Sequence, residues 1–355
     1  MNKPDFLDIQ ASRWMEGTGP HSDIVLTSRV RMARNLKELP FPCLAENEQR
    51  GKVLEEVNRV LENNKEFFQS YKKVDLSKLT PLERQLCVEK HIISPHMVKD
   101  VKNSCVLLKE DESVSIMINE EDHIRIQSLL PGLQLENAWK QGDAIDDVLE
   151  EQLDFAFNDQ LGYLTACPTN VGTGMRASLM MHLPGLAITK QINRILSALY
   201  QVGMVVRGLY GEGTEVVGNI LQLSNQITLG QNEKEIIRNL FGVARQLLEQ
   251  EEGARQGLLN ECREKLADRA GRAYGILSNA RIMSSIEAMQ LFSDFRLGVD
   301  LGLLSSVDLK VLNQLLVMIS PAYLQQKEDK ELTDYDIDIS RASLIREKLA
   351  EAAQN

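Results

Sequence analysis

The sequence holds three consecutive carboxylates, Glu120, Glu121 and Asp122, at the end of an alternating apolar run, followed by His123 and Arg125. Like charges held close together raise one another's pKa and destabilise a fold unless a cation compensates them. A guanidinium is well suited because its planar donors match a pair of carboxylates. The run therefore predicts a guanidinium-binding site in which a carboxylate could supply the base that a guanidinium nitrogen needs. A solvated β-turn is the alternative.

Several arginines lie in or beside predicted strands or glycine-rich loops, although surface helices are their commoner location. They are Arg29, Arg31, Arg125, Arg176 and Arg207. Guanidinium groups bind phosphate oxygens in pairs, so a converging set could hold a triphosphate without a lysine-based phosphate loop, whose motif is absent from the sequence. Taken singly, each arginine could instead be a solvated strand-edge charge or an ion-pair partner.

A further candidate is Cys167, which opens the glycine-rich segment CPTNVGTGMR. Backbone N–H groups in such a loop could bind an anion. The thiol could be an activated thiolate or a small buried side chain. His91, in HIISPH, lacks a metal-binding pattern, and a role against phosphate stays open. The five cysteines are scattered without a C-x-x-C pair, which favours reduced thiols, and we expect no bound metal held by the protein alone.

The composition is that of an ordinary globular protein, with 355 residues, 43% hydrophobic and 26% charged. The net charge of -11 argues against a general nucleic-acid or anionic-membrane binder. No run approaches about 18 apolar residues, and the N-terminal segment lacks the apolar stretch of a signal peptide. We therefore expect a cytoplasmic protein.

Alternating hydrophobicity predicts the strands that must position these residues. Residues 23–35 predict a strand with Arg29 and Arg31 on one face. Residues 105–129 predict a hairpin whose second strand begins just after the three carboxylates. Residues 204–230 predict two strands around a glycine-rich turn.

Helical periodicity predicts helices over residues 6–15, 52–64, 142–160 and 188–203. Asn232 and Glu235 predict the capping box of a further long helix, with Gly253 as its stop signal. Nearly everything beyond that point is predicted to be helical. The sequence therefore predicts two domains, residues 1–255 and residues 256–355.

Five segments, in order, resemble the phosphagen (guanidino) kinases, the family of the creatine and arginine kinases. They are TSRVRMAR from Thr27, NEEDHIR from Asn119, CPTNVGTGMRA from Cys167, RGLYGEG from Arg207 and LSNQITLG from Leu223. The resemblance runs from about residue 23 to about residue 253. Within the family it is strongest to the bacterial protein arginine kinases, which phosphorylate arginine side chains in proteins and mark them for a Clp protease.

The resemblance implies an α+β fold, with an antiparallel sheet flanked by helices and an all-helical C-terminal domain. It also implies ATP and Mg²⁺ as cofactors. Glu121 matches the family's guanidine-binding carboxylate, with Glu120 beside it, and Cys167 matches its reactive cysteine. The nucleotide contacts implied by the motifs are Thr27, Ser28, Arg29, Val30, Arg31, His91, Arg125, Arg176, Ala177, Ser178, Leu179, Met180, Arg207, Gly208, Leu209, Tyr210, Gly211 and Glu212.

The C-terminal segment DISRA resembles the Arg-Asp-x-x-Arg-Ala motif with which protein arginine kinases sense phosphoarginine. Asp338, Arg341 and Ala342 match the motif, whereas Ile337 stands where the family has arginine. That replacement removes one bidentate phosphate contact. A solvated helix start is the alternative for this segment.

The kind of substrate is also suggested by resemblance. Family members that act on small guanidines carry a helical domain ahead of the first arginine motif, whereas only 22 residues precede Asp23 here. A free amino acid must be enclosed, but a side chain on a protein needs an open groove. We expect protein substrates with exposed arginine, an activator protein, a Clp chaperone or protease, and a homodimer. A kinase for a free guanidino compound and a non-catalytic Clp adaptor stay as alternatives.

Overall fold

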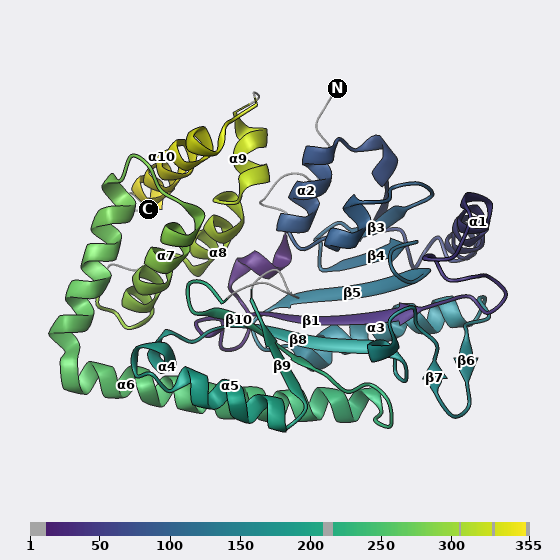
Figure 1. The fold of residues 1–355 in the computed structure, drawn as a ribbon, viewed down its shortest axis with the longest axis horizontal. Coiled ribbons are helices and arrows are strands. Elements are labelled where there is room, and N and C mark those ends of the chain that lie inside the picture. The colour runs from purple at the N-terminus through teal and green to yellow at the C-terminus, as the bar shows by residue number, and fades with distance from the viewer. Residues whose placement is uncertain (1–11, 209–215, 305–306, 329–330, 353–355) are drawn as a thin grey trace.

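The computed structural model describes residues 12–208, 216–304, 307–328 and 331–352. Its centre is an eight-stranded sheet in the order β2-β3-β4-β5-β1-β8-β10-β9, and each neighbouring pair is antiparallel (Figure 1). The strands are β1 (Val25–Arg34), β2 (Tyr71–Asp75), β3 (Cys105–Lys109), β4 (Val114–Ile118), β5 (Ile124–Pro131), β8 (Met175–His182), β9 (Met204–Arg207) and β10 (Ile220–Asn225). This arrangement confirms the predicted antiparallel sheet flanked by helices.

One face of the sheet is apolar because alternate residues of every central strand are hydrophobic. Val30 of β1, Ile126 of β5 and Leu179 of β8 all lie in this buried layer. Helices cover it, and Figure 1 shows one of them, α3, behind the sheet and another, α6, along its lower edge. The covering helices are α1 (Asn47–Asn63), α3 (Leu135–Glu150), α4 (Pro184–Ile188), α5 (Ile192–Gln201) and α6 (Glu233–Asn279).

The opposite face of the sheet is divided into two halves. Over β3 and β4, Val106, Leu108 and Met117 are covered by α2 (Pro81–Glu89). Over β5, β1, β8 and β10 the same face carries polar side chains, among them Arg29 and Gln222, that line an open cavity. Since α2 covers only the apolar half, the polar half is left for ligands.

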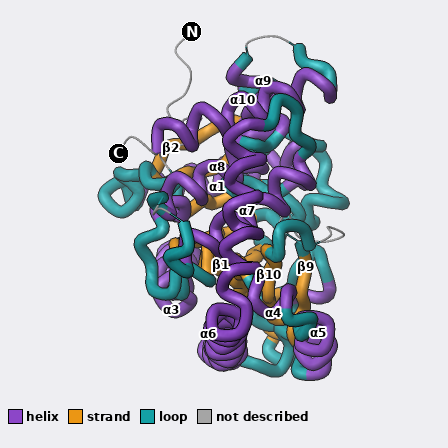
Figure 2. The backbone as a smooth tube through the Cα atoms, turned by 90° about the vertical axis from the view of Figure 1, so that its left-hand side faces the viewer, coloured by secondary structure: helices purple, strands orange, loops and turns teal. Residues whose placement is uncertain are grey.

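The helical C-terminal region consists of α7 (Ser285–Asp300), α8 (Leu309–Met318), α9 (Pro321–Lys327) and α10 (Asp334–Ala352). Figure 2 shows these helices in front of the strands when the molecule is viewed from the left-hand side of Figure 1. Helices α7, α8 and α10 share a core of aliphatic side chains that also contains Phe292 and Phe295. No described helix is both long and apolar enough to cross a membrane.

The predicted stop of the long helix at Gly253 is wrong. The capping box of Asn232 and Glu235 is present, but α6 continues to Asn279. Arg255 explains the continuation, because it is buried and donates to Glu251 at 2.7 Å and to Asp300 at 3.4 Å. Such contacts outweigh the modest helix penalty of one glycine. The helix departs from helical geometry only at Cys262, and the domain boundary at residue 255 stays a prediction.

Other predicted helices also differ in extent. The helix predicted over 188–203 is divided, because α4 ends at Ile188 and α5 spans Ile192–Gln201. The helix over 142–160 begins earlier and ends at Glu150, because the chain then turns into the hairpin of β6 (Phe157–Asn158) and β7 (Gly162–Tyr163). Phe157 pairs with Tyr163 in this hairpin and is exposed, so it is not a core position of a helix. Of the predicted N-terminal helix, residues 13–16 form a 3-10 turn and residues 1–11 lie outside the described residues.

Glu89, the last residue of α2, ties the sheet to the helical region. Its buried carboxylate accepts the N–H groups of Ala322 at 2.9 Å and Tyr323 at 3.1 Å, in the first turn of α9. Burial raises the pKa of Glu89 to about 7, although these two hydrogen bonds and Arg341 act in the opposite direction. The folded state therefore holds the proton of Glu89 more tightly than the unfolded chain does.

This shift predicts how stability depends on pH. Because the pKa of Glu89 rises from 4.5 to about 7 on folding, its contribution to stability is present below pH 4.5 and is lost as the pH rises through 7. We expect the free energy of unfolding of the wild type, relative to Glu89→Gln, to fall between pH 4.5 and 7.5. Urea unfolding of both proteins across this range measures it, and a pH-independent difference would contradict it.

Candidate active site

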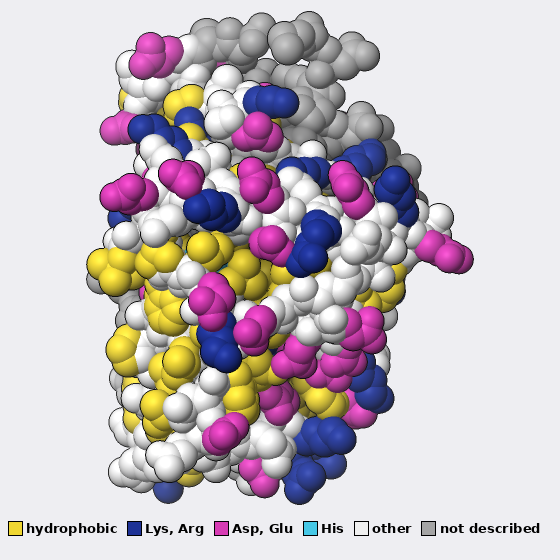
Figure 3. Space-filling view, turned by 90° about the vertical axis from the view of Figure 1, so that its right-hand side faces the viewer, with side chains coloured by type: hydrophobic (Ala, Val, Ile, Leu, Met, Phe, Trp, Pro, Cys, Tyr) yellow, Lys and Arg dark blue, Asp and Glu magenta, His cyan; other side chains and the backbone are white. Residues whose placement is uncertain are grey.

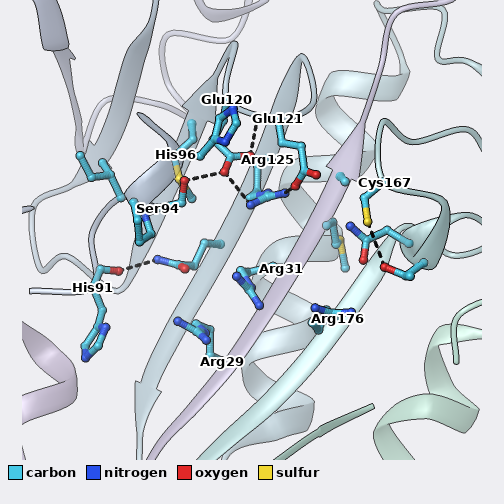
Figure 4. Close-up of a pocket in the computed structure, with 18 of the residues that line it drawn as sticks. Arg29, Arg31, His91, Ser94, His96, Glu120, Glu121, Arg125, Cys167 and Arg176 are labelled. Atoms are coloured by element: carbon cyan, nitrogen blue, oxygen red, sulfur yellow. Dashed lines mark hydrogen bonds and ion pairs between the residues drawn. The ribbon is translucent and has the colours of Figure 1, made fainter. Parts of the chain in front are cut away.

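The polar half of the sheet forms one cavity of about 750 Å³ (Figure 4). Its lining comes from separate strands and loops that the sheet brings together. Nine of the predicted site residues line it, namely Arg29, Arg31, His91, Glu120, Glu121, Arg125, Cys167, Arg176 and Arg207. The predicted carboxylates and the predicted arginines therefore share a single cavity.

The arginines are gathered by strand register. β1 lies between β5 and β8, with Arg31 opposite Arg176 and Arg29 opposite Ser178. The Arg29 guanidinium donates to Gln222 at 2.7 Å and to the Ser178 hydroxyl at 3.3 Å, so neutral partners hold it in place. Neither of these partners offsets its charge.

This crowding of positive charge changes the titration of the arginines. Burial, and then the charges of Arg125, Arg176 and Arg207, lower the pKa of Arg29 to about 10. Burial and the charge of Arg29 likewise hold the pKa of Arg31 well below its ordinary value. Cations that destabilise one another in this way favour a polyanion such as a nucleotide phosphate chain.

The acidic turn is compensated by Arg125. Its guanidinium donates to Glu120 at 2.7 Å and to Glu121 at 3.0 Å, and lies 3.8 Å from Asp122 (Figure 4). Burial alone would lower the pKa of Arg125, but the three carboxylates together raise it above its ordinary value. The turn also needs Asn119 at φ 56°, a left-handed conformation that asparagine tolerates. Arg125 therefore compensates the three carboxylates, and binding of a substrate guanidinium at this turn stays a prediction.

The carboxylates of Glu120 and Glu121 differ in their exposure and in their hydrogen-bond partners. Glu120 is buried, and its carboxylate accepts from Ser94, Arg125 and the N–H of Glu121. The side chain of Glu121 is 39% exposed and has Arg125 as its ion-pair partner. Glu121 is therefore the carboxylate that an incoming guanidinium can reach, whereas Glu120 holds the turn in shape.

Cys167 and His91 lie at other parts of the cavity wall. The Cys167 sulfur lies 3.0 Å from the Thr169 hydroxyl, in the loop that leads to β8. Burial, and then the charge of Arg29, lower the pKa of His91 to about 3, so its imidazole is neutral at physiological pH. His91 can therefore offer hydrogen bonds to a ligand but no charge.

Asn35, which the sequence patterns do not single out, connects the acidic turn to the cysteine loop through Asp122. The Asn35 amide donates to Asp122 at 2.7 Å and to the carbonyl of Leu164 at 3.1 Å, and accepts the N–H of His123. The same oxygen of Asp122 accepts the N–H of Ala166, next to Cys167, at 2.7 Å. Asn35 and Asp122 are both buried, so this pair fixes the position of Cys167 relative to the glutamates.

Other predicted nucleotide contacts lie outside the cavity lining. Because strand side chains alternate, the side chains of Val30, Ala177 and Leu179 lie in the core on the opposite face. The Ser28 hydroxyl donates to the carbonyl of Gly132 and accepts the N–H of Gln134. Like the three core residues, Ser28 can therefore offer a ligand only backbone groups. Thr27 and Met180, which pair across β1 and β8, do not line the cavity, and neither does Gly208, just after β9. Leu209, Tyr210, Gly211 and Glu212 lie outside the described residues.

The predicted phosphoarginine residues lie in the helical region, away from the cavity lining. Arg341 is buried and donates at 2.8 Å to the carbonyls of Ile319 and Met283, and it also contacts Asp338. These bonds join α10 to the end of α8 and to the turn before α7. Ile337 packs against an apolar cluster. Recognition of phosphoarginine by Asp338 and Arg341 stays a prediction.

Comparison with known families extends this picture. The family model described as ATP:guanido phosphotransferase, C-terminal catalytic domain, matches residues 52–254, and the model of the protein-arginine kinase McsB C-terminal domain matches residues 263–355. A crystal structure of lombricine kinase superposes with a TM-score of 0.60 at 26% identity, over 72% of each chain. The fold and the site define an ATP:guanido phosphotransferase, and the chain belongs to that family.

Similar proteins of known name show to which group of the family the chain belongs. The chain is 54% identical over 341 residues to the protein-arginine kinase of Moorella thermoacetica, covering 96% of this chain and 97% of that protein. It is 52% identical over 350 residues to the protein-arginine kinase of Brevibacillus brevis, covering 98% of both. Within its family, the chain is a member of the protein-arginine kinases.

The connection between Asn35 and Asp122 can be tested by exchanging its two ends. Asn35→Asp sets two carboxylates against each other and removes the amide donor, so the cysteine loop should shift. A misplacement of about 1 Å can cost about 10²-fold in rate, and we expect kcat for arginine phosphorylation to fall by that order while KM for ATP changes little. The double variant Asn35→Asp/Asp122→Asn restores a donor facing an acceptor and should recover most of kcat.

The rate at which iodoacetamide alkylates Cys167 is a second readout. In a variant that is merely less stable, this rate would not change in step with kcat. The rate of alkylation should change in Asn35→Asp and return toward the wild-type rate in the double variant. Circular dichroism checks that both variants are folded. Wild-type kcat in the single variant, or a double variant as impaired as the single one, would contradict the positioning role.

Proposed function

We propose that this chain transfers the γ-phosphoryl group of ATP to arginine side chains of proteins. One observation carries the proposal, namely that Arg125 joins the acidic turn to the arginine set inside a single cavity. One end of such a cavity suits a planar cation, and the other suits a polyanion. A guanidino phosphotransferase needs both of these ligands side by side.

In the proposed reaction Glu121 orients the target guanidinium and accepts the proton that its nitrogen loses. A nitrogen–phosphorus bond forms, the bond from the γ-phosphorus to the bridging oxygen breaks, and ADP leaves. Arg29, Arg31 and Arg176 hold the phosphates, and Cys167 contacts the substrate nitrogens. A positioned base contributes about 10²- to 10⁴-fold and a charge-stabilising arginine about 10³- to 10⁵-fold, so the arginines matter as much as Glu121.

The donor set of the cavity fits Mg²⁺ that arrives with the nucleotide. Among the described residues there is no cluster of three or more His, Cys, Asp or Glu able to hold a metal ion. Mg²⁺ usually binds one or two carboxylates together with substrate phosphates, and Glu120 and Glu121 line the cavity beside the arginines. When bound, Mg²⁺ would neutralise part of the phosphate charge.

The relatives support a protein substrate. Those with about half of their residues identical are named protein-arginine kinases, and they match nearly the full length of the chain. The solved structures with lower identity are named for lombricine and taurocyamine, which keeps a kinase for a free guanidino compound as the second candidate.

The biological setting is part of the same proposal. The modified proteins would be marked for a Clp protease in the cytoplasm, with an activator protein and a homodimer as further partners. The match of residues 263–355 to the C-terminal domain of a protein-arginine kinase supports such a role for the helical region. Asp338 and Arg341 are the residues there that we propose for phosphoarginine recognition.

The activity is tested by incubating the protein with γ-labelled ATP and either an unfolded protein or free arginine. We expect acid-labile label on arginines of the protein. Glu121→Gln should lower this rate at least about 10²-fold, because the base is lost, while binding of a fluorescent ATP analogue is retained. Glu110→Gln, an exposed site in the turn between β3 and β4, is the matched control and should keep the wild-type rate.

Label found only on free arginine would support the second candidate and reject a protein substrate. An unchanged rate in Glu121→Gln would contradict the assignment of the base. Loss of nucleotide binding in that variant would instead show that Glu121 belongs to the ATP side of the cavity.

A further inference from the structure

Large apolar side chains are exposed on the segments that border the cysteine loop. Phe157 and Leu161 of the β6–β7 hairpin are 54% and 45% exposed, and Ile227 and Leu229 after β10 are 48% and 50% exposed. We call these four residues the apolar rim. Figure 3 faces the side of the molecule that lies on the right in Figure 1 and shows hydrophobic side chains gathered there among charged ones.

Hydrogen bonds hold the segment after β10 against the cysteine loop. The Thr228 hydroxyl, between Ile227 and Leu229, lies within hydrogen-bond distance of the carbonyls of Val171, at 2.7 Å, and Thr169, at 3.0 Å. Thr169 is also the partner of the Cys167 sulfur. Gln226, next to Ile227, lines the cavity itself. This part of the rim is therefore continuous with the cavity wall.

The hairpin is fixed on the other side of the same loop. The N–H of Tyr163 donates to the carbonyl of Gly172 at 2.8 Å, and the Arg34 guanidinium lies 3.5 Å from the centre of the Tyr163 ring. The backbones meet so closely that a Cβ on Gly172 would lie 2.3 Å from the carbonyl oxygen of Thr228. Both halves of the rim are thus placed at defined positions around the loop that carries Cys167.

Isolated apolar residues on a surface are common, but exposed apolar residues on segments fixed against a loop of the cavity wall suggest a binding surface. The proposed substrate supplies an occupant. Only the arginine of a protein substrate enters the charged cavity, so the residues on either side of it must leave across the wall. An extended chain advances about 3.3 Å per residue, so the residues closest to the arginine in sequence pass over the segments that border the cavity.

We infer that the apolar rim binds hydrophobic side chains flanking the target arginine in an extended segment of the client. This inference rests on the proposed function and names the class of substrate. In a folded protein such hydrophobic neighbours are buried, and unfolding exposes them. The residues that flank an arginine would then decide how strongly its segment binds. The net charge of -11 also favours approach of an arginine-containing segment.

Two peptides of equal length test the rim, each with one arginine, flanked by Leu and Ile in the first and by Ser and Asn in the second. We expect the wild type to have a KM about tenfold lower for the first, which corresponds to about 1.4 kcal/mol. Ile227→Ser/Leu229→Ser should abolish this preference and leave kcat/KM for the polar peptide unchanged. Phe157→Ser/Leu161→Ser tests the hairpin half in the same way.

Ile286→Ser is the matched control, because Ile286 is 59% exposed and lies on α7 of the helical region. It should keep the wild-type preference. The binding role of the apolar rim would be overturned by equal KM values for the two peptides in the wild type, or by a preference that survives in both double variants. Neither outcome would affect the kinase activity itself. Phosphorylation of neither peptide would contradict the proposed function, and the rim with it.

Discussion

Arg125 is the residue on which the site depends, because it is the cation that allows three adjacent carboxylates to fold into a buried turn. Its guanidinium donates to Glu120 at 2.7 Å and to Glu121 at 3.0 Å. The same charge contributes to lowering the pKa of Arg29 to about 10. One side chain thus joins a negative and a positive end of the cavity, and each end is left short of opposite charge from the protein alone.

The fold tolerates this crowding of like charges because the two faces of one sheet are separate. Alternate residues of β1, β5 and β8 go to the core, where helices cover them, and the residues between them go to the cavity. Hydrophobic burial on the first face stabilises the fold and offsets the destabilisation caused by the charged groups on the second face. Glu89 accepts a hydrogen bond from the first turn of α9, and Arg255 donates to Asp300 of α7. These contacts attach the helical region to the part of the chain that forms the cavity.

Strand periodicity is enough to predict that Arg29 and Arg31 lie on one face of a strand, because alternation is a property of the extended backbone. The role of Asn35 could not be predicted, since it depends on a contact with a residue 87 positions away, which local patterns do not encode. Gly253 misleads for a related reason. Its local penalty of about 1 kcal/mol is outweighed by the buried contacts of Arg255, which only the tertiary structure contains.

The proposed reaction requires that a protein's arginine and a nucleotide's phosphates meet in this cavity from opposite ends. A crystal structure with Mg²⁺, a non-hydrolysable ATP analogue and an arginine-containing peptide tests it most directly. We expect the peptide guanidinium within hydrogen-bond distance of Glu121, and phosphate oxygens against Arg29 and Arg176. A guanidinium bound elsewhere on the surface, or phosphates away from both arginines, would contradict it.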